Sequence, residues 1–448
     1  MAKRERTRLR IGIIGAGISG LSAAWLLAKR HDVTLFEKAP RLGGHSNTVE
    51  VPAPDGGSVP VDTGFIVYNP VNYPNLVALF QHLDVATKSS NMSFAVSLGD
   101  GAFEYAGNGV GSLLAQKQNL LRPRFWSMLY GILRFYRQAP RDMPRIANSE
   151  LSLGDYLRAG KFGEAFARDH LLPMAGAIWS APPEALLDYP ARSFISFFDN
   201  HGLLKLTRRP PWRTVEGGSK TYVAKLTRSF ADRVRVGCAA TAIHRVGDGV
   251  RVRDTSGHIS QFDDVVIATH ADEALHLLVD ASPEERQALG AFRYSRNIAV
   301  LHSDASLVPK RKSVWSSWNY LGARTDRGDA LCVTYWMNRL QGIAGPRDYF
   351  VTLNPYREPR AERIHHTDIY EHPIFDAGAL QAQVKLGALQ GKRNTWFCGA
   401  SLGAGFHEDG LSSGLAVAEA LGGLMRPWSQ RLTKSPRPQQ HSHAELVP

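Results

Sequence analysis

The stretch IGIIGAGISGLSAAWLLAKRHDVTLFEKAPRLGG, from Ile11 to Gly44, decides the fold of this chain. Its first four residues form a short apolar run rich in branched side chains, which predicts a buried parallel strand. Gly15, Gly17 and Gly20 follow this strand in the spacing GxGxxG. In such a turn the first glycine permits a tight bend, the second leaves room for a diphosphate, and the third lets the next helix pack closely.

A helix and a second strand complete the pattern. Residues 19–30 place leucine and alanine side chains on one face, which predicts a helix whose first N–H groups face a diphosphate. Glu37 follows the next strand, Asp32–Phe36. It lies close to the position, roughly 20 residues beyond the last glycine, at which an acid binds a ribose hydroxyl. The stretch therefore predicts an adenine-dinucleotide site.

The residues after Glu37 narrow the choice of cofactor. Arg41-Leu42-Gly43-Gly44 and Val61-Asp62-Thr63-Gly64-Phe65 resemble two segments of the flavin-containing amine oxidase and phytoene desaturase superfamily. In that superfamily the Gly-Gly pair passes beside the diphosphate and the flavin. The resemblance therefore implies that the cofactor is FAD.

Further segments match the superfamily in the same order along the chain. Val215-Glu216-Gly217-Gly218 resembles the segment that leads back into the FAD domain, and residues 264–269 resemble the strand that ends beside the dinucleotide. In residues 395–424 a strand, a glycine-rich turn and a helix beginning at Leu411 resemble the closing motif, whose helix points at the flavin. Ala400 and Ser401 stand where relatives have the acid that holds a ribityl hydroxyl, which leaves open how that chain is held.

The resemblance implies cofactor contacts from several parts of the chain. Ala240 takes the place of a valine whose backbone meets the adenine in many relatives. The expected cofactor-binding residues are Gly15, Gly17, Ile18, Ser19, Gly20, Glu37, Lys38, Arg41, Gly43, Gly44, His45, Thr63, Gly64, Ala240, Ala268, Thr269, Gly399, Ser401, Gly410, Leu411 and Ser412.

These segments predict an α/β protein in two parts. One is a Rossmann-like FAD-binding domain of the GR2 type, and the other is an α+β substrate domain built on a mostly antiparallel sheet, which alternating residues between 293 and 350 support. The expected boundaries are 8–66, 213–275 and 391–426 for the FAD-binding domain, 67–212 (with a helical insertion) and 276–390 for the substrate domain, and 427–448 for a disordered tail.

Composition limits the remaining choices. The chain has 448 residues, 3 cysteines without a CxxC motif, and a formal net charge of +12. The cysteines fit a reducing cytoplasm, and we find neither a signal peptide nor a run of about 18 apolar residues. No nucleic-acid motif accompanies the positive charge, so we expect no nucleic-acid partner and favour an anionic lipid. His365, His366 and His372 lack the spacing of a zinc-binding helix, and we expect no metal site.

Residues 119–141 (NLLRPRFWSMLYGILRFYRQAPR) predict the most unusual helix. Apolar side chains recur on one face at helical spacing, and the charged residues are all arginines. Two interpretations stay open. The segment is either a basic helix that lies in the interface of the inner membrane face or an ordinary amphipathic helix of the substrate domain.

The reaction shared by the superfamily is removal of hydride from a C–H bond by the flavin. Amine oxidases of the superfamily place a lysine near the flavin, and the corresponding residues 292–301 contain none here. Gly43-Gly44-His45 and the run from Gly405 to Gly410 instead resemble a bacterial subgroup of predicted FAD-binding proteins. Members are often encoded beside cyclopropane-fatty-acyl-phospholipid synthase. The resemblance implies a small-molecule or acyl-lipid substrate and such a synthase as a partner.

His407, Glu408 and His45 are the candidate catalytic residues. His407 and Glu408 precede the closing helix and His45 follows the Gly-Gly turn, and a histidine beside the flavin can shuttle a proton. The alternative is that His407 and Glu408 only cap the turn. Three functions therefore remain open: an FAD-dependent oxidoreductase acting on an acyl lipid, an amine or polyamine oxidase, and a flavin-bearing accessory protein of a lipid methyltransferase.

Overall fold

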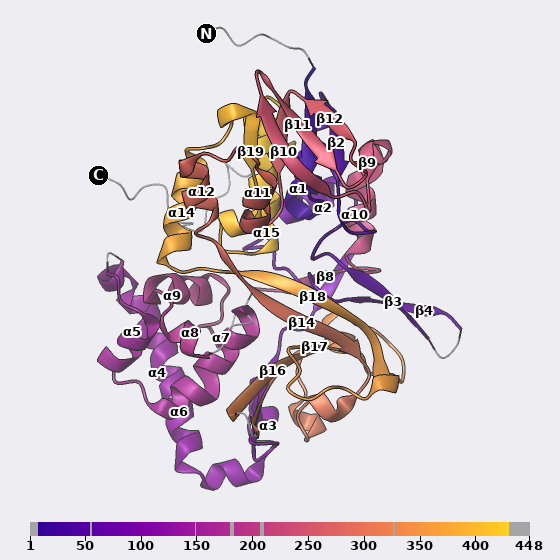
Figure 1. Cartoon of the computed structure of the whole chain (residues 1–448). Coiled ribbons are helices and arrows are strands. Elements are labelled where there is room, and N and C mark those ends of the chain that lie inside the picture. The colour runs from indigo at the N-terminus through magenta and orange to yellow at the C-terminus, as the bar shows by residue number, and fades with distance from the viewer. Residues whose placement is uncertain are drawn as a thin grey trace.

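The computed structural model describes residues 8–53, 56–147, 149–179, 183–206, 210–325 and 328–429. Its upper part in Figure 1 is organised around a five-stranded parallel sheet in the order β19-β13-β1-β2-β9. The strands are β1 (Arg10–Ile14), β2 (Asp32–Phe36), β9 (Val234–Arg235), β13 (Asp264–Ile267) and β19 (Thr395–Phe397). They come from all three segments expected for the FAD-binding domain.

Helices and a small sheet cover the two faces of this parallel sheet. On one face α1 (Ile18–Leu27) packs so closely on α15 (His407–Ala420) that a Cβ at Gly414 would lie 2.1 Å from the Ser19 carbonyl oxygen. The antiparallel strands β10 (Ala240–Val246), β11 (Gly249–Asp254) and β12 (Ile259–Phe262) cover the other face. Beside them lie α11 (Ala271–Leu277), α12 (Pro283–Leu289) and α14 (Ala377–Gly387).

A seven-stranded sheet forms the lower part of the molecule, in the order β18-β14-β17-β16-β15-β6-β7. The long strands β14 (Arg293–His302) and β18 (Ile364–Ile374) run from the FAD-binding part into this sheet (Figure 1). The others are β6 (Phe94–Leu98), β7 (Phe103–Ala106), β15 (Trp318–Thr325), β16 (Gly328–Trp336) and β17 (Phe350–Leu353). Among the described strand pairs of this seven-stranded sheet, only β15 with β6 is parallel. The mixed α/β fold with a mostly antiparallel second sheet is therefore confirmed.

A group of helices packs on the seven-stranded sheet at the lower left of Figure 1. The helix expected within residues 119–141 is α4 (Pro123–Ile146), which begins later because Pro123 occupies its first position, and Lys117–Leu121 forms a separate 3₁₀ turn. The neighbouring helices are α5 (Leu153–Ala159), α6 (Glu164–Phe166), a π-helical turn (Ala167–Leu171), α7 (Leu172–Trp179), α8 (Pro183–Leu187) and α9 (Ala191–Asn200).

Several shorter elements complete the described fold. They are β3 (Thr48–Pro52), β4 (Ser58–Asp62), α2 (Pro74–His82), β5 (Thr87–Ser90), α3 (Val110–Leu113), β8 (Trp212–Val215), α10 (Lys220–Thr227) and α13 (Met337–Leu340). No helix in the described ranges has both the length and the apolar character needed to cross a bilayer.

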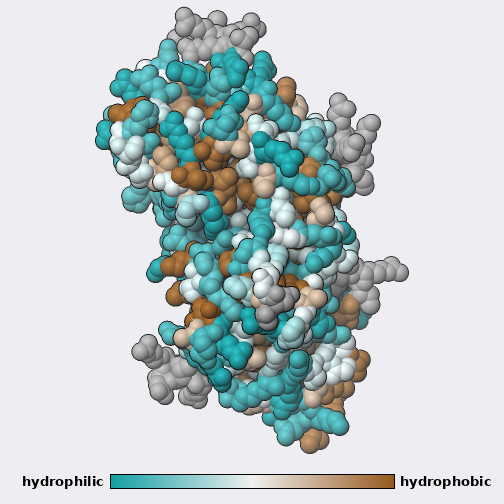
Figure 2. All heavy atoms as spheres, turned by 90° about the vertical axis from the view of Figure 1, so that its right-hand side faces the viewer, coloured by the Kyte–Doolittle hydropathy of each residue, from teal (hydrophilic) through white to brown (hydrophobic). Residues whose placement is uncertain are grey.

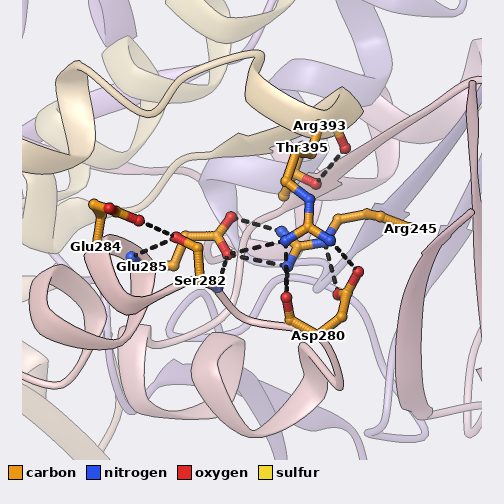
Figure 3. A network of polar contacts seen from close by, with 7 residues as sticks. All are labelled: Arg245, Asp280, Ser282, Glu284, Glu285, Arg393 and Thr395. Carbon is orange, nitrogen blue, oxygen red and sulfur yellow. Dashed lines mark hydrogen bonds and ion pairs between the residues drawn. The ribbon is translucent and has the colours of Figure 1, made fainter. Parts of the chain in front are cut away.

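A buried ion-pair network fastens the small sheet to α12 (Figure 3). Arg245 on β10 has a side chain only 3% exposed. It donates to Asp280 at 2.8 Å and to both carboxylate oxygens of Glu285 at 2.6 and 3.0 Å. Arg393 approaches the same Asp280 from the turn before β19. The network therefore joins three segments that are far apart in the sequence.

The chain stays ordered beyond the point where we expected a disordered tail. Trp428 is 4% exposed, stacks on Trp25 at 5.9 Å between ring centroids, and donates from Nε1 to Asn75 at 3.0 Å. The expected boundary at Pro427 is therefore wrong for this residue, because an indole packs on α1. The rest of the predicted tail, residues 430–448, lies outside the described residues.

Candidate active site at the glycine-rich turn

The three glycines of the turn have distinct surroundings. Gly15 has φ +99°, which an L side chain rarely adopts, and its N–H donates to the Phe36 carbonyl at 2.8 Å. A Cβ at Gly20 would lie 1.9 Å from the Gly15 carbonyl oxygen, so only glycine lets α1 pack this closely. A Cβ at Gly17 would meet no atom within 4 Å. The space in front of the α1 N-terminus is therefore open to a ligand.

A cavity of 1390 Å³ extends from this open space. It runs between the parallel sheet and strands β14 and β18 and continues among β6, β7, α4, α7 and α9. Sites for one small ligand usually measure about 300–1,000 Å³. The cavity therefore has room for a dinucleotide and for a second molecule.

Most of the predicted cofactor-binding residues line this cavity. They are Gly15, Gly17, Ile18, Ser19, Glu37, Lys38, Arg41, Gly43, Gly44, His45, Thr63, Gly64, Ala240, Ala268, Thr269, Gly399 and Ser401. Gly20 lies behind the turn and acts on the packing of α1.

The predicted residues of the closing helix are placed differently. Helix α15 begins at His407 rather than at Leu411, so Gly410, Leu411 and Ser412 lie one turn inside it. Leu411 is fully buried, Gly410 packs against Ile18 and Ser19, and none of the three lines the cavity. Gly410 and Leu411 thus pack inside the protein, and the Ser412 hydroxyl accepts from the Asn75 amide at 2.9 Å, so cofactor contact by these three residues stays a prediction.

Glu37 closes the nucleotide end of the cavity. Its carboxylate accepts from the Ala16 N–H at 2.7 Å and from the Ala39 N–H at 2.8 Å. A carboxylate has about four acceptor positions, so two remain for ribose hydroxyls. Lys38 pairs with Glu273, and Arg41 donates to the Gly44 carbonyl at 2.8 Å. The glycine cradle and this free acceptor capacity fit an adenine dinucleotide.

His45 and His407 both line the cavity. Burial lowers the pKa of His45 to about 3, and the neighbouring His372 acts in the same direction. Burial also lowers the pKa of His407 to about 3. The His407 ring stacks on Phe65 at 3.9 Å, and its Nε2 lies 2.8 Å from the Tyr222 hydroxyl. Both imidazoles are therefore neutral at pH 7, and a pKa of about 3 makes each of them a weak base.

Glu408 is oriented away from the cavity. Its carboxylate accepts from the Asn75 N–H at 2.9 Å, the Asn75 amide at 2.8 Å and the Leu76 N–H at 2.9 Å. It therefore caps the N-terminus of α2. This placement argues against the catalytic role that we expected for Glu408.

The position without the usual acid is polar nonetheless. Ser401 lines the cavity, and its hydroxyl is hydrogen-bonded to Tyr294, whose oxygen also accepts from the Ala271 N–H at 2.9 Å. Ser401 thus offers a hydroxyl, without charge, where relatives offer a carboxylate. The three histidines considered for a metal have separate partners: His365 bonds to Ser303, His366 to Asp368 and His372 to Asn297.

The sequence alone did not bring together the polar residues in the far arm of the cavity. Tyr105, Tyr136 and His170 line it together, as does His201. The His201 Nδ1 donates to the Phe197 carbonyl at 2.9 Å, and burial lowers the pKa of His201 to about 4. Helical spacing could have marked only Tyr136, because the other three are brought together by contacts between distant elements.

Comparisons with known proteins agree with this architecture. The protoporphyrinogen oxidase of Schizosaccharomyces pombe is 31% identical over 169 residues, which cover 34% of this chain and 33% of that protein. The chain thus matches about a third of the length of this curated relative.

Two solved structures share the fold over nearly their whole length. The CLA-producing fatty acid isomerase from P. acnes has a TM-score of 0.63 at 16% identity, covering 94% of this chain and 99% of that one. A putrescine oxidase has a TM-score of 0.65 at 14% identity, with coverages of 92% and 98%. Residues 18–339 match the family described as flavin containing amine oxidoreductase, and the chain therefore belongs to this family of FAD-dependent oxidoreductases.

Proposed function

We propose that the protein removes hydride from a C–H bond of an acyl lipid, with FAD as the acceptor. One observation carries this proposal: the cavity that begins at the glycine cradle continues into an uncharged arm. The lining residues between 66 and 212 include Met92, Phe94, Met174 and Ile178, and none of those described is Asp, Glu, Lys or Arg. An acyl chain is the substrate class that gains most from burial in such an arm.

The residues of the cavity have complementary roles in this proposal. Gly17 and Gly44 would lie against the diphosphate of FAD, and Glu37 would accept from the ribose. FAD, when bound, supplies the hydride acceptor. His45 and His407 would accept or return a proton beside the ring, and for this the bound flavin or substrate would have to raise their pKa from about 3. The apolar arm would exclude water from the reacting bond.

An amine or polyamine oxidase is the second candidate. The aromatic side chains Trp212, Trp318 and Tyr335 in the cavity wall favour it, because aromatic rings attract a cationic substrate. The absence of lysine from β14 counts against it.

An interfacial role of α4 would bring the enzyme to its lipid. Trp126, Tyr130 and Leu133 are 52, 69 and 56% exposed on one face of the helix, and Arg137 continues that face. Figure 2 shows a few hydrophobic side chains exposed among hydrophilic ones at the lower end of the molecule. We propose that this face contacts anionic lipid headgroups.

Binding to anionic vesicles tests the interfacial role. Replacing Trp126, Tyr130 and Leu133 together by serine should abolish binding, and Arg137→Glu should weaken it. Arg124 is unsuited to this test because it forms two bonds to Asp169, at 2.7 and 2.9 Å. Unchanged vesicle binding by the triple variant would rule out the contact.

A cyclopropane-fatty-acyl-phospholipid synthase remains the proposed partner. If the chain were only a flavin-bearing accessory protein, it would be pulled down with such a synthase, and its flavin would not be reduced by any lipid.

Anaerobic bleaching of the flavin decides between the candidates. Purified protein is mixed separately with phospholipids, free fatty acids and polyamines while its visible absorbance is recorded. Bleaching by an acyl lipid supports the proposal, and bleaching by amines alone supports the second candidate. A protein that stays colourless after refolding with excess FAD would refute any redox function.

A further inference from the structure

A second cavity, of 390 Å³, lies among the helices and shares no described lining residue with the cavity at the glycine-rich turn. Its walls are α4 from Arg134 onward and the end of α5 with the residues that follow it. The described lining residues include three cations, Arg134, Arg145 and Lys161, and no acid. A cavity with this lining attracts an anion.

The three cations are held to different degrees. Arg134 donates to the carbonyl oxygens of Gly160 and Lys161, the latter at 3.1 Å, so its guanidinium is fixed at the end of α5. A guanidinium has five N–H donors, and these two bonds leave others for a ligand. Lys161 is exposed, and the Arg145 side chain is 72% exposed. The cavity therefore combines one fixed cation with two that can turn towards a ligand.

The acidic group beside the cavity is already engaged. The Asp142 carboxylate accepts from the Tyr156 hydroxyl at 2.8 Å and from the Gln138 amide at 3.2 Å. Arg145 lies 3.4 Å from the same carboxylate. One carboxylate does not balance three cations, so the cavity keeps a surplus of positive charge.

The cavity adjoins the exposed face of α4 that we propose to contact lipid. Residues four apart on a helix are neighbours on its surface, so Arg134 lies beside Tyr130, which is 69% exposed. Gln138, another lining residue, directly follows Arg137 of that face. Aromatic side chains that enter the headgroup region of a bilayer would therefore bring the cations of the cavity to the level of the lipid phosphates.

We propose that this cavity binds the phosphate of an anionic phospholipid headgroup. The inference rests on the proposed lipid contact of α4 and names the headgroup chemistry that this contact selects. Arg134 offers a planar set of donors to the phosphate oxygens, and Arg145 and Lys161 approach from other sides. A tetrahedral phosphate presents oxygens in more directions than a planar carboxylate does, so it meets the three cations better. The volume of 390 Å³ lies within the range of about 300–1,000 Å³ of small-ligand sites.

Flotation with vesicles of matched surface charge tests the site. The FAD-loaded full-length protein is mixed with phosphatidylcholine vesicles that contain either phosphatidylglycerol or cholesteryl hemisuccinate, adjusted to the same zeta potential. The first additive carries an anionic phosphate and the second a carboxylate. We expect the wild-type protein to bind the phosphatidylglycerol vesicles at least about tenfold more tightly, the value of one charge-assisted hydrogen bond.

Variants of the two exposed cations locate the effect. Arg145→Gln combined with Lys161→Gln should remove the preference, while binding to both vesicles persists through the aromatic face of α4. Arg134 is unsuited to this test because its bonds hold the end of α5. Arg168→Gln combined with Lys385→Gln is the matched control, because it removes the same charge from exposed positions outside the cavity and should keep the preference.

The outcomes separate this inference from the proposed function. Equal binding of both vesicles by the wild-type protein, or a preference that survives in the Arg145 and Lys161 double variant, overturns the site. Loss of the preference in about 1 mM inorganic phosphate at constant ionic strength would indicate a site for free phosphate and would also overturn the headgroup assignment. A wild-type protein that binds neither vesicle overturns the lipid contact of α4 together with this site. Failure of every acyl lipid to bleach the flavin overturns the proposed function instead, whatever the vesicles show.

Discussion

Gly17→Ala should separate cofactor binding from folding. Gly17 has φ −70° and ψ 177°, a conformation that alanine adopts without strain. A methyl group there meets no protein atom within 4 Å, so the free energy of unfolding of the FAD-free protein should change by less than about 1 kcal/mol. The methyl group would, however, stand in the space in front of the α1 N-terminus.

The expected loss of affinity for FAD follows from the hydrogen bonds that a diphosphate would form with the N-terminus of α1. A diphosphate pushed away from the helix N-terminus loses one or two charge-assisted hydrogen bonds, each contributing about 1.5–3 kcal/mol. The sum of about 1.5–6 kcal/mol corresponds to a Kd for FAD raised at least about tenfold.

Titration of the FAD-free protein with FAD, followed by flavin fluorescence, measures this change. Gly111→Ala is the matched control, because its Cβ also meets no atom within 4 Å but the residue does not line the cavity. Gly20→Ala should instead destabilise the protein with or without FAD, since its Cβ would lie 1.9 Å from a carbonyl oxygen. Wild-type FAD affinity in Gly17→Ala would refute the placement of the diphosphate.

Other expected outcomes concern stability, rate and pH. Arg245→Met should lower the free energy of unfolding in urea by about 3–5 kcal/mol, because buried Glu285 loses its close cationic partner and keeps only Arg393 at 4.0 Å, and a loss below about 1 kcal/mol would contradict this. His407→Ala should retain FAD but slow its reduction by an acyl substrate about 100-fold or more, whereas a wild-type rate would exclude proton transfer by His407. Glu408→Ala should leave the rate of flavin reduction unchanged and lower the thermal unfolding midpoint, because the N–H groups at the start of α2 lose their acceptor. A slower flavin reduction at an unchanged unfolding midpoint would instead support a catalytic role for Glu408. Because His45 has a pKa lowered to about 3 by burial, the unfolded chain binds a proton below pH 6.5 that the folded chain does not. The free energy of unfolding of the FAD-free protein, measured by urea titration, should therefore fall from pH 6.5 towards pH 4, by about 1.4 kcal/mol per pH unit for each such histidine, with a shallower slope in His45→Phe.

The cofactor half could be predicted from the sequence because its signals are local. Gly15 needs a backbone conformation and Gly20 a close approach that only glycine allows, and the spacing to Glu37 follows from one strand–helix–strand unit. The closing helix was predicted less well. The run from His407 to Gly410 looked like a turn because of its polar residues and glycine, yet tertiary packing on α1 extends the helix back to His407.

The substrate half depends on contacts that no local pattern reveals. Glu408 caps a helix more than 300 positions earlier in the chain, through its bonds to Asn75. Tyr105, Tyr136 and His170 meet only because a strand edge, a long helix and a π-helical turn converge. A single irregular turn decides which side of that segment faces the cavity, and helical periodicity cannot place it.

The order of strands in the parallel sheet has a consequence for biosynthesis. In the sheet β1 lies between β2, which is synthesised directly after it, and β13, which is synthesised some 250 residues later. Helix α15, which packs on α1, ends only at Ala420. At roughly 5–20 residues per second, a ribosome needs on the order of 20–80 s to supply that last helix. During this interval the glycine-rich turn has been synthesised, but β13 and α15, which pack beside it, have not. Capture of the flavin nucleotide is therefore a late event, and apolar strands emerging early need shielding by chaperones until the chain returns to them.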